Sequence, residues 1–315
     1  MIKINKDDDI FPDKLRKISN PPEQLYLDGN INLLNSKCIS IIGSRNCSEN
    51  GQKIAKKFAT ELSTSGLTIV SGLAKGIDTV AHTFSYLNPG KTIAVLGCGL
   101  NNIFPEENIE LAKKIVENNG LIISEYPPNE EAKSKYFIER NRIVSALSLG
   151  ILVVEAFSRS GTSATAKFAR EQQREVFSVP HEIWDSRGVG TNKLIKNGAK
   201  LVTDTSDILS ALNLNKLRKY YLDLKSTGIF DEFSTKPNYY ISNKKSSTLK
   251  NNSVSPVFTN FKEEKIYNLI KEYPCTSQND LLLKTSYSIN EILSILFMLE
   301  VEGYIKKVQG GYTCM

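Results

Sequence analysis

Short apolar runs alternate with longer amphipathic stretches through the first two thirds of the chain. The apolar runs are rich in Ile, Val and Leu and are bounded by Gly, Pro or Ser, which is typical of buried strands. They lie at 38–42, 67–70, 92–96, 121–124, 151–154, 176–179 and 200–203. Helical patterns separate them, over 52–63, 79–86, 106–118, 140–147 and 162–173. This alternation predicts an α/β fold, a doubly wound and mostly parallel sheet with helices on both faces.

The remaining segments differ from this alternation. Residues 1–36 are interpreted as a short lead-in, with turn sequences, to the α/β domain at 37–210. From 211 to 260 the periodicity fades and Ser, Asn and Lys dominate, which is typical of a linker, here beginning as a helical extension through Tyr221. The final segment, 261–315, predicts a small C-terminal winged-helix domain. Its helices are expected at 263–272, 278–284 and 289–302, and its hairpin at 303–312.

The chain is mildly basic, with a net charge of +6, and most of the excess lies in the linker. Residues 211–260 carry eight Lys and Arg against three acids, whereas residues 261–315 carry six Lys against seven acids. A basic balance favours an anionic partner such as nucleic acid. Because the last segment is net negative, we expect the winged helix not to be the main nucleic-acid site.

Composition excludes several classes of protein. No run approaches the roughly 18 apolar residues of a membrane helix, and the charged N-terminus is unlike a secretory signal. The five cysteines lack C-x-x-C spacing, and the chain has two histidines. We therefore expect reduced thiols in a cytoplasmic protein, with no metal site and no cofactor.

Four glycine-bearing turns stand where a predicted strand gives way to a helix. They are Gly43–Arg45, Ser71–Asp78, Gly97–Gly99 and Ser158–Thr162. In an open parallel sheet such turns lie together outside the carboxyl ends of the strands. Backbone N–H groups and helix N-termini point into that crevice and bind anions. The turns therefore predict a phosphate-bearing ligand.

The first and third turns carry little information when each is taken alone. In the first, Gly43 allows a close turn, Ser44 supplies a hydroxyl group and Arg45 offers a planar fork for phosphate. A tight turn with a surface arginine explains the same residues equally well. The turn at 97–99 lacks the third glycine of a dinucleotide fingerprint, so it gives poor support to coenzyme binding.

The second turn is more specific. Gly72 and Gly76 allow a backbone cradle after Ser71, with Lys75 beside it and Asp78 placed to cap the following helix. The turn is not a P-loop, because no G-K-[ST] sequence closes it.

The stretch 133–142 interleaves cations with aromatic residues. A nucleobase stacked on Phe137 could gain roughly 1–3 kcal/mol while Lys133 and Lys135 hold the backbone. The alternative is that Phe137 packs inward and the charged side chains only solvate the start of a helix.

The fourth turn follows a strand that ends near Glu155. Ser160, Gly161 and Thr162 open a helix rich in Ser and Thr, whose amides and hydroxyl groups suit an anion. Glu155 is the one carboxylate placed for chemistry, for holding the turn or for binding a sugar hydroxyl.

Taken together, these segments resemble the DprA/Smf family of DNA-processing proteins over roughly residues 10–210. Each matching motif is weak alone, but the ordered series is specific. The motifs are Gly-Ser-Arg at 43–45, Ser-Gly-x-Ala-x-Gly-Ile-Asp at 71–78, Ala-His at 81–82, Gly-x-Gly-Leu at 97–100, Pro105, Arg-Asn-Arg-Ile at 140–143, Leu-Ser at 147–148, Val-Val-Glu-Ala at 153–156, Ser-Gly-Thr at 160–162, Arg-Glu-Val-Phe at 174–177, Val-Pro at 179–180, and Gly-Thr-Asn at 190–192 with Gly-Ala at 198–199.

The resemblance implies an extended Rossmann domain that binds single-stranded DNA and does not act as an enzyme. It also implies a homodimer that loads the recombinase RecA onto incoming strands during natural transformation. By position, Arg45, Lys75, Arg140 and Arg142 would face the phosphates, and Phe137 would stack on a base. The predicted DNA-binding set is Gly43, Ser44, Arg45, Ser71, Gly72, Lys75, Gly76, Lys133, Lys135, Phe137, Arg140, Asn141, Arg142, Ser160, Gly161 and Thr162.

Two departures from the family pattern stand out, and one alternative function remains. His181 stands where the family usually has glycine, which is expected to alter the neighbouring loop, and Phe104 replaces the usual tyrosine. The alternative is a nucleotide-binding enzyme similar to the Lonely Guy phosphoribohydrolases, which share the sheet. That alternative is weaker because Thr165 stands in place of the hydrolytic glutamate.

Overall fold

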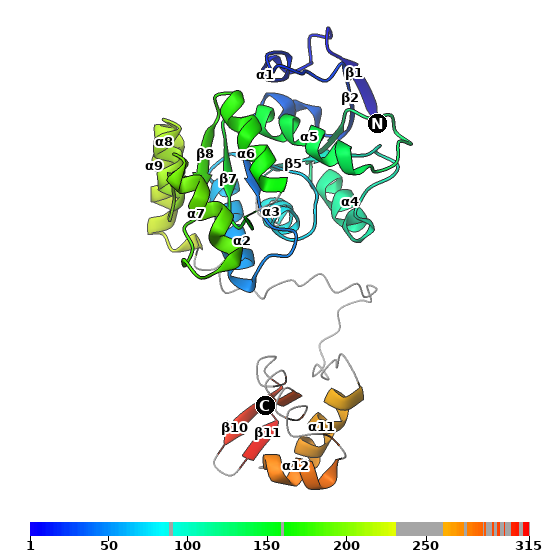
Figure 1. The fold of residues 1–315 in the computed structure, drawn as a ribbon, viewed down its shortest axis with the longest axis vertical. Helices are drawn as coiled ribbons and strands as arrows, with labels where there is room; N and C mark the ends of the chain where they lie inside the picture. Colours follow the sequence, from blue (N-terminus) through cyan, green and yellow to red (C-terminus); the bar gives the residue numbers. More distant parts are fainter. Residues whose placement is uncertain are drawn as a thin grey trace. The chain divides into compact units, whose positions relative to one another are not determined.

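The computed structural model describes residues 1–87, 91–158 and 161–230, and part of the chain beyond 260. The described residues of that later part are 261–273, 276–285, 287, 292, 295, 296, 299, 304–308 and 311–314. The chain divides into two compact units, Met1–Tyr239 and Tyr240–Met315. Figure 1 shows both units.

Within the described residues, the first unit contains a nine-stranded sheet in the order β1-β2-β6-β5-β4-β3-β7-β8-β9. The strands are β1 (Ile2–Asn5), β2 (Gln24–Gly29), β3 (Cys38–Ile42), β4 (Thr68–Ser71), β5 (Lys91–Leu96), β6 (Leu121–Ser124), β7 (Gly150–Val153), β8 (Glu175–Ser178) and β9 (Lys200–Leu201). All neighbours from β6 to β9 pair in parallel. The predicted α/β class and mostly parallel sheet are thus confirmed.

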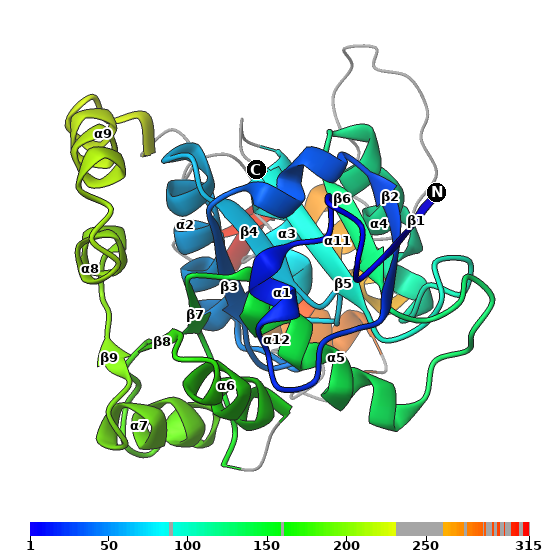
Figure 2. The same cartoon turned by 90° about the horizontal axis from the view of Figure 1, so that it is seen from above.

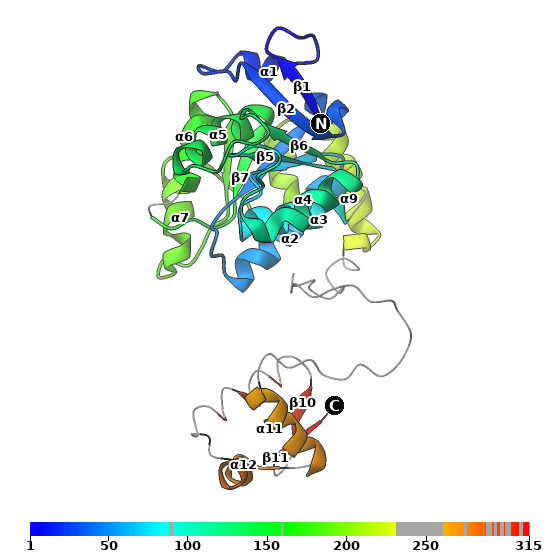
Figure 3. The same cartoon turned by 90° about the vertical axis from the view of Figure 1, so that its right-hand side faces the viewer.

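Helices connect the strands and cover both faces of the sheet. They are α1 (Asp13–Arg16), α2 (Glu49–Thr64), α3 (Ile77–Tyr86), α4 (Ile109–Glu117), α5 (Ser134–Leu147), α6 (Gly161–Glu171), α7 (Val189–Lys196), α8 (Thr205–Ala211) and α9 (Asn215–Ser226), with 3-10 turns η1 (Ile31–Asn35), η2 (Glu106–Asn108) and η3 (Ser186–Gly188). Figure 3 shows α5 and α6 on one side of the sheet and α3, α4 and α9 on the other. None of the described helices is both long and apolar enough to span a membrane.

Side-chain alternation in the central strands supplies an apolar surface to both helix layers. In β3, Ile42 joins the cluster under α5 and α6, whereas Ile39 and Ile41 join the cluster under α2, α3 and α9. Both faces are buried, so all five residues of β3 are buried. This explains why the strands read as near-continuous apolar runs in the sequence.

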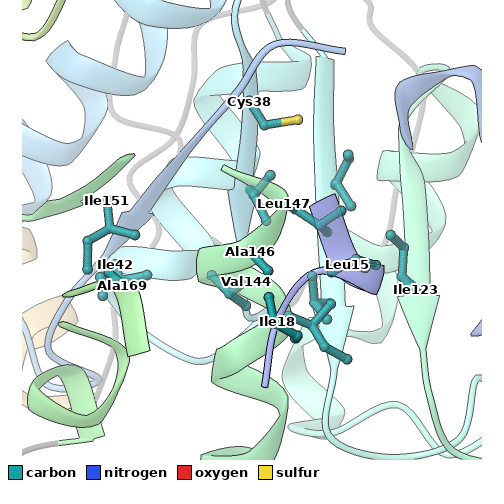
Figure 4. Close-up of a cluster of buried hydrophobic side chains, with 14 of the residues drawn as sticks. Leu15, Ile18, Cys38, Ile42, Ile123, Val144, Ala146, Leu147, Ile151 and Ala169 are labelled. Carbon is teal, nitrogen blue, oxygen red and sulfur yellow. The ribbon is translucent and has the colours of Figure 1, made fainter. Parts of the chain in front are cut away.

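The segment before residue 37 is part of this sheet. β1 and β2 form an antiparallel pair, and β2 extends the sheet by pairing antiparallel to β6. Leu15 and Ile18 point into the cluster that Val144 and Leu147 of α5 also enter (Figure 4). The segment interpreted from the sequence as a lead-in therefore contributes two strands and core side chains.

The second unit has two described helices followed by a β-hairpin. α11 covers Phe261–Glu272 and α12 covers Gln278–Lys284, and β10 (Ile305–Val308) pairs antiparallel to β11 (Gly311–Cys314). Of the predicted third helix, the structure describes residues 292, 295, 296 and 299, which are helical and buried, and the rest lies outside the described residues. The predicted linker lies outside them from residue 231 to 260.

Candidate functional site

A cavity of about 410 Å³ opens where the strand order reverses, beside the carboxyl ends of β3 and β4. Chain connections run from β3 toward β6 on one side and from β7 toward β9 on the other, so crossover helices diverge at this point (Figure 2). Such a switch point is where open α/β sheets bind ligands. The predicted site residues that line the cavity are Gly43, Ser44, Arg45, Gly72, Phe137, Arg140, Asn141, Gly161 and Thr162.

Two glycines allow the second turn to close against its neighbours. Gly76 has a φ of +76°, and a Cβ there would lie 2.4 Å from the carbonyl oxygen of Ser44. At Gly72, a Cβ would lie 2.5 Å from the guanidinium of Arg140. The Ile77 N–H donates to the Ser44 carbonyl at 3.2 Å, which joins the first turn to the second. These glycines therefore hold the first two turns and the floor of the cavity together.

Asp78 organises the second turn from inside the helix. Helix α3 begins at Ile77 with Gly76 as its N-cap, so Asp78 lies inside the helix and does not cap it as predicted. Its carboxylate instead reaches back to accept the N–H groups of Gly72, at 3.0 Å, and Ala74, at 3.4 Å. Burial raises the pKa of Asp78, while Arg140 and these amides act to lower it. The carboxylate sets the shape of the loop.

Arg140 forms the floor of the cavity and is 4% exposed. Its Nη1 donates to the carbonyl oxygens of Gly72, at 2.6 Å, and Val95, and its Nε donates to Asn141 Oδ1 at 3.2 Å. Three of the five guanidinium N–H groups therefore bind the protein itself. Burial lowers the pKa of Arg140. The side chain links the ends of β4 and β5, rather than presenting all of its donors to a phosphate as predicted.

Arg142 is not brought to the cavity. Its guanidinium makes a bidentate pair with Glu125, at 2.7 and 2.6 Å. It also donates to the carbonyl oxygens of Asn20, at 2.8 Å, and Glu139, at 2.9 Å. Two residues beyond Arg140, a helix of 3.6 residues per turn points the side chain elsewhere. The structure thus places Arg142 in a structural ion pair, and not among the residues that line the cavity.

Phe137 and Arg45 form the aromatic and cationic part of the cavity wall. The guanidinium carbon of the exposed Arg45 lies 5.6 Å from the centroid of the Phe137 ring. Phe104, which is 46% exposed, packs on Phe137 with the ring centroids 5.5 Å apart. Phe137 therefore faces the cavity instead of packing wholly inward, which was the alternative interpretation of this stretch.

The predicted lysines do not line the cavity. Lys75 pairs with Glu107, and Lys133 pairs with Glu130 at 2.6 Å. Lys135 is exposed, with its ammonium 5.3 Å from the centroid of the Tyr136 ring. Exposed pairs of this kind are weak and exchange easily with other charges. The lysines can contribute to the electrostatic field, but their contact with a ligand stays a prediction.

The remaining predicted residues have mixed positions. Gly161 and Thr162 begin α6 at the cavity wall, where first-turn N–H groups have no partner within their own helix. Ser44 is buried, and its Oγ accepts the N–H of Asn46 at 3.1 Å. Ser71 is fully buried, and its hydroxyl donates to the carbonyl of Ile41 at 2.7 Å, so it ties β4 to β3. Ser160 lies outside the described residues.

Glu155 holds a helix end. Its carboxylate accepts the Ser48 N–H at 2.9 Å and the Ser48 hydroxyl, and it is fully buried outside the cavity lining. His181 Nε2 lies 4.0 Å from Glu155 Oε1, and it has no hydrogen-bond partner among the described residues. The structure thus shows Glu155 holding the N-terminus of α2 at Ser48, a role that differs from holding the turn at 158–162 that follows its own strand.

Eight residues of the lining are absent from the predicted DNA-binding set: Ile42, Asn46, Ala74, Asp78, Ile138, Val144, Phe157 and Thr165. Asn46 and Ile138 directly follow predicted site residues, so chain adjacency is a signal that could have found them. Phe157 follows the end of β7 by four residues, and strand ends at a switch point are the expected place for ligand contacts.

Comparison with known proteins places this geometry in a family. The family model of DNA recombination-mediator protein A matches residues 3–213. The DNA processing protein DprA of Streptococcus pneumoniae is 43% identical over 203 residues, which is 64% of this chain and 71% of that protein. Its X-ray structure matches with a TM-score of 0.64, covering 66% of this chain and 73% of that one.

Two further relatives agree. The protein Smf of Escherichia coli is 42% identical over 209 residues, which cover 66% of this chain and 56% of that protein. A solved structure of DNA processing protein A from Helicobacter pylori, described for its single-stranded DNA binding mode, is 29% identical with a TM-score of 0.61. That match covers 68% of this chain and 96% of that one. The fold, the ordered glycine turns and these matches together show that the chain belongs to the family of DNA recombination-mediator protein A, the DprA/Smf proteins.

Proposed function

We propose that this chain binds single-stranded DNA in the cavity at the carboxyl ends of β3 and β4. Family membership and the strand-binding relative from Helicobacter pylori support this proposal. We further propose that the chain, acting as a cytoplasmic homodimer and without enzymatic turnover, loads RecA onto the strand during natural transformation and recombination.

The observation that carries the proposal is the pairing of Phe137 with Arg45 in the cavity wall. Single-strand binding proteins combine aromatic rings, on which bases stack, with cations that follow the phosphate backbone. The Arg45 guanidinium is exposed and 5.6 Å from the ring centroid, so a base at Phe137 would have its phosphate within reach of a planar cation.

Backbone groups supply a second set of contacts. The first turn of α6, at Gly161 and Thr162, offers N–H groups and the positive end of a helix to a phosphate. Neither group distinguishes one base from another. Binding is therefore expected to depend on the strand's backbone and on stacking, and only weakly on base sequence.

A nucleotide hydrolase is less well supported by this geometry. Such an enzyme needs an acid or base group within reach of the substrate. Glu155, the carboxylate considered for this chemistry, is engaged by Ser48, and Asp78 is engaged by the amides of Gly72 and Ala74. Both carboxylates already have structural partners.

Strand binding is tested by titrating the chain with an oligothymidine at several salt concentrations. If four or five phosphates are neutralised, the log–log slope of affinity against salt should be about −3. A flat slope, or release of free base from a nucleoside monophosphate, contradicts the proposal.

Two variants separate the contacts. Arg45→Ala should weaken binding and make the slope less steep by about 0.7, the value of one phosphate contact to a single strand. Phe137→Ala should weaken binding by roughly 1–3 kcal/mol and leave the slope unchanged, because it removes stacking and no charge. Lys113→Ala is the matched control, since Lys113 is an exposed cation on α4 outside the cavity lining, paired with Glu110.

The finer proposals have their own measurements. Sedimentation at several concentrations tests the homodimer, and a concentration-independent monomer mass contradicts it. RecA loading is tested by the rate of RecA filament formation on a strand bound by the chain. Acceleration supports loading, and an unchanged or slower rate contradicts it.

A further inference from the structure

The loop that follows β8 exposes two large apolar side chains. Ile183 is 83% exposed and Trp184 is 77% exposed. Trp184 is the single tryptophan of the chain. A flat aromatic side chain held in water is a surface for stacking, and it is among the residues that most often dominate binding energy.

The Trp184 ring is held in place. Its indole N–H donates to Glu182 Oε2 at 2.7 Å. The loop closes on itself through the Asp185 N–H to the Glu182 carbonyl, at 3.1 Å, and through the Gly188 N–H to the Asp185 carbonyl, at 2.9 Å. At its base, the His181 N–H donates to Asn192 Oδ1 at 3.0 Å. Less conformational entropy is therefore lost when a ligand stacks on the ring.

The loop stands next to the proposed DNA-binding cavity. The Ala156 N–H donates to the Arg187 carbonyl at 2.9 Å, and the Gly190 N–H donates to the Ala156 carbonyl at 2.7 Å. The residue after Ala156 is Phe157, which lines the cavity. β8 is the neighbour of β7 in the sheet, and neighbouring strands lie about 4.8 Å apart. A DNA strand that crosses the carboxyl ends of β4, β3 and β7 reaches the end of β8 next.

The charges of this loop fit a base better than a phosphate. Within the described loop 181–188, the guanidinium of Arg187 is paired with Asp185 at 3.1 Å, and the Glu182 carboxylate accepts the indole N–H. The loop offers an aromatic face without an unpaired cation beside it. A contact there would therefore add stacking energy and leave the number of neutralised phosphates unchanged.

We propose that Trp184 is a second stacking platform for a nucleobase of the same single strand that occupies the cavity, an inference that rests on the proposed function. Phe137 receives one base, the first turn of α6 lies along the path, and Trp184 receives a base farther along the strand. A protein partner that covers the Ile183–Trp184 pair is the competing occupant, and the experiment distinguishes the two.

The tryptophan is its own reporter, because the full-length chain has no other. Two probes are titrated while binding is followed separately by the anisotropy of a dye on the strand. One is an oligothymidine of about 16 nucleotides, the upper end of the site sizes of strand-binding folds. The other is an abasic strand of the same length, which has phosphates and no bases. The oligothymidine should quench the Trp184 emission in step with the anisotropy, and the abasic strand should bind more weakly without quenching.

Variants give the matched measurement. Trp184→Ala should raise the Kd for the oligothymidine about five-fold or more with an unchanged salt slope, the effect of losing one stacked base. Trp184→Phe should restore most of the affinity, and Tyr220→Ala, which removes an exposed aromatic side chain on α9, should leave it unchanged. Circular dichroism checks that each variant is folded.

The outcomes separate the two proposals. If anisotropy shows binding while the emission and the Trp184→Ala affinity stay unchanged, the second platform is wrong and the proposed function stands; a protein partner then becomes the occupant to test. If Trp184→Ala and Trp184→Phe lose affinity equally, stacking is not the contact. If the chain does not bind the oligothymidine at all, the proposed function itself fails.

Discussion

Replacing Arg142 by alanine should damage the fold and spare the ligand site. The Arg142 and Glu125 side chains are 8% and 14% exposed, and they meet in two hydrogen bonds of 2.6 and 2.7 Å. Removing one partner of a buried pair leaves the other charge uncompensated, which costs about 3–5 kcal/mol. The carbonyl oxygens of Asn20 and Glu139 also lose their donor. A loss of about 3–5 kcal/mol is a large share of the free energy of unfolding of an ordinary domain.

The assay is urea unfolding of Arg142→Ala followed by circular dichroism, beside strand affinity measured on the folded protein. The midpoint should fall with little change in the slope of free energy against urea. The Kd should stay near that of the unaltered chain. The double variant Arg142→Ala with Glu125→Ala should cost less than the sum of the two single changes, because the groups interact directly. A variant with normal stability and lost affinity would refute this reasoning and return Arg142 to the phosphate-binding set.

Three other predictions concern two glycines of the cavity region, the carboxylate of Asp204 and the C-terminal segment. Gly76→Ala should lower the free energy of unfolding by about 1–3 kcal/mol, because a φ of +76° strains any other residue and the added Cβ meets the Ser44 carbonyl. Gly161→Ala has open space around its Cβ, so its free energy of unfolding should stay within about 0.5 kcal/mol in the same assay. Burial alone would raise the pKa of Asp204, but hydrogen bonds from Lys225 and Ser206 lower this pKa below its ordinary 3.8. The ionised Asp204 therefore stabilises the fold above that value, and this stabilisation is lost as pH falls through the lower folded-state pKa. Asp204→Asn should flatten the loss of stability in unfolding measured against pH, and an unchanged profile would contradict the assignment. Deletion of 261–315 should leave oligothymidine affinity nearly intact, since that segment is net negative, and a large loss of affinity would show that the winged helix takes part in binding.

The central strands could be predicted from the sequence because they are buried on both faces. In β3 and β6 every residue is buried, so apolar runs mark both strands to the residue. The edge strand β1 buries only Ile4, and its neighbour β2 buries alternate residues. Turn sequences surround both strands, so the pattern did not reveal them. The pairing of β2 with β6 joins residues far apart in the sequence, so a local pattern of apolar residues does not predict it.

The site was predictable in place but not in detail. Glycine turns after strands locate the crevice, because only glycine fits the close approaches at positions such as 72 and 76. Which of the two arginines lines the cavity was not predictable, since Arg140 and Arg142 lie two residues apart and their partners, Val95 and Glu125, come from other strands and loops. A local motif specifies the residue type, and tertiary packing decides where the side chain goes.

The buried Arg140 side chain has a consequence for how a ligand enters. Arg140 donates to the carbonyl of Gly72, which follows β4, and to that of Val95 in β5, so the floor of the cavity is formed without a ligand. Because a preformed site does not rearrange, the conformational entropy lost on binding is that of the ligand. If the proposed function holds, a flexible single strand can adjust its backbone to this fixed site, whereas a stiff duplex would first have to be opened. We therefore expect the chain to favour unpaired DNA because the two polymers differ in stiffness.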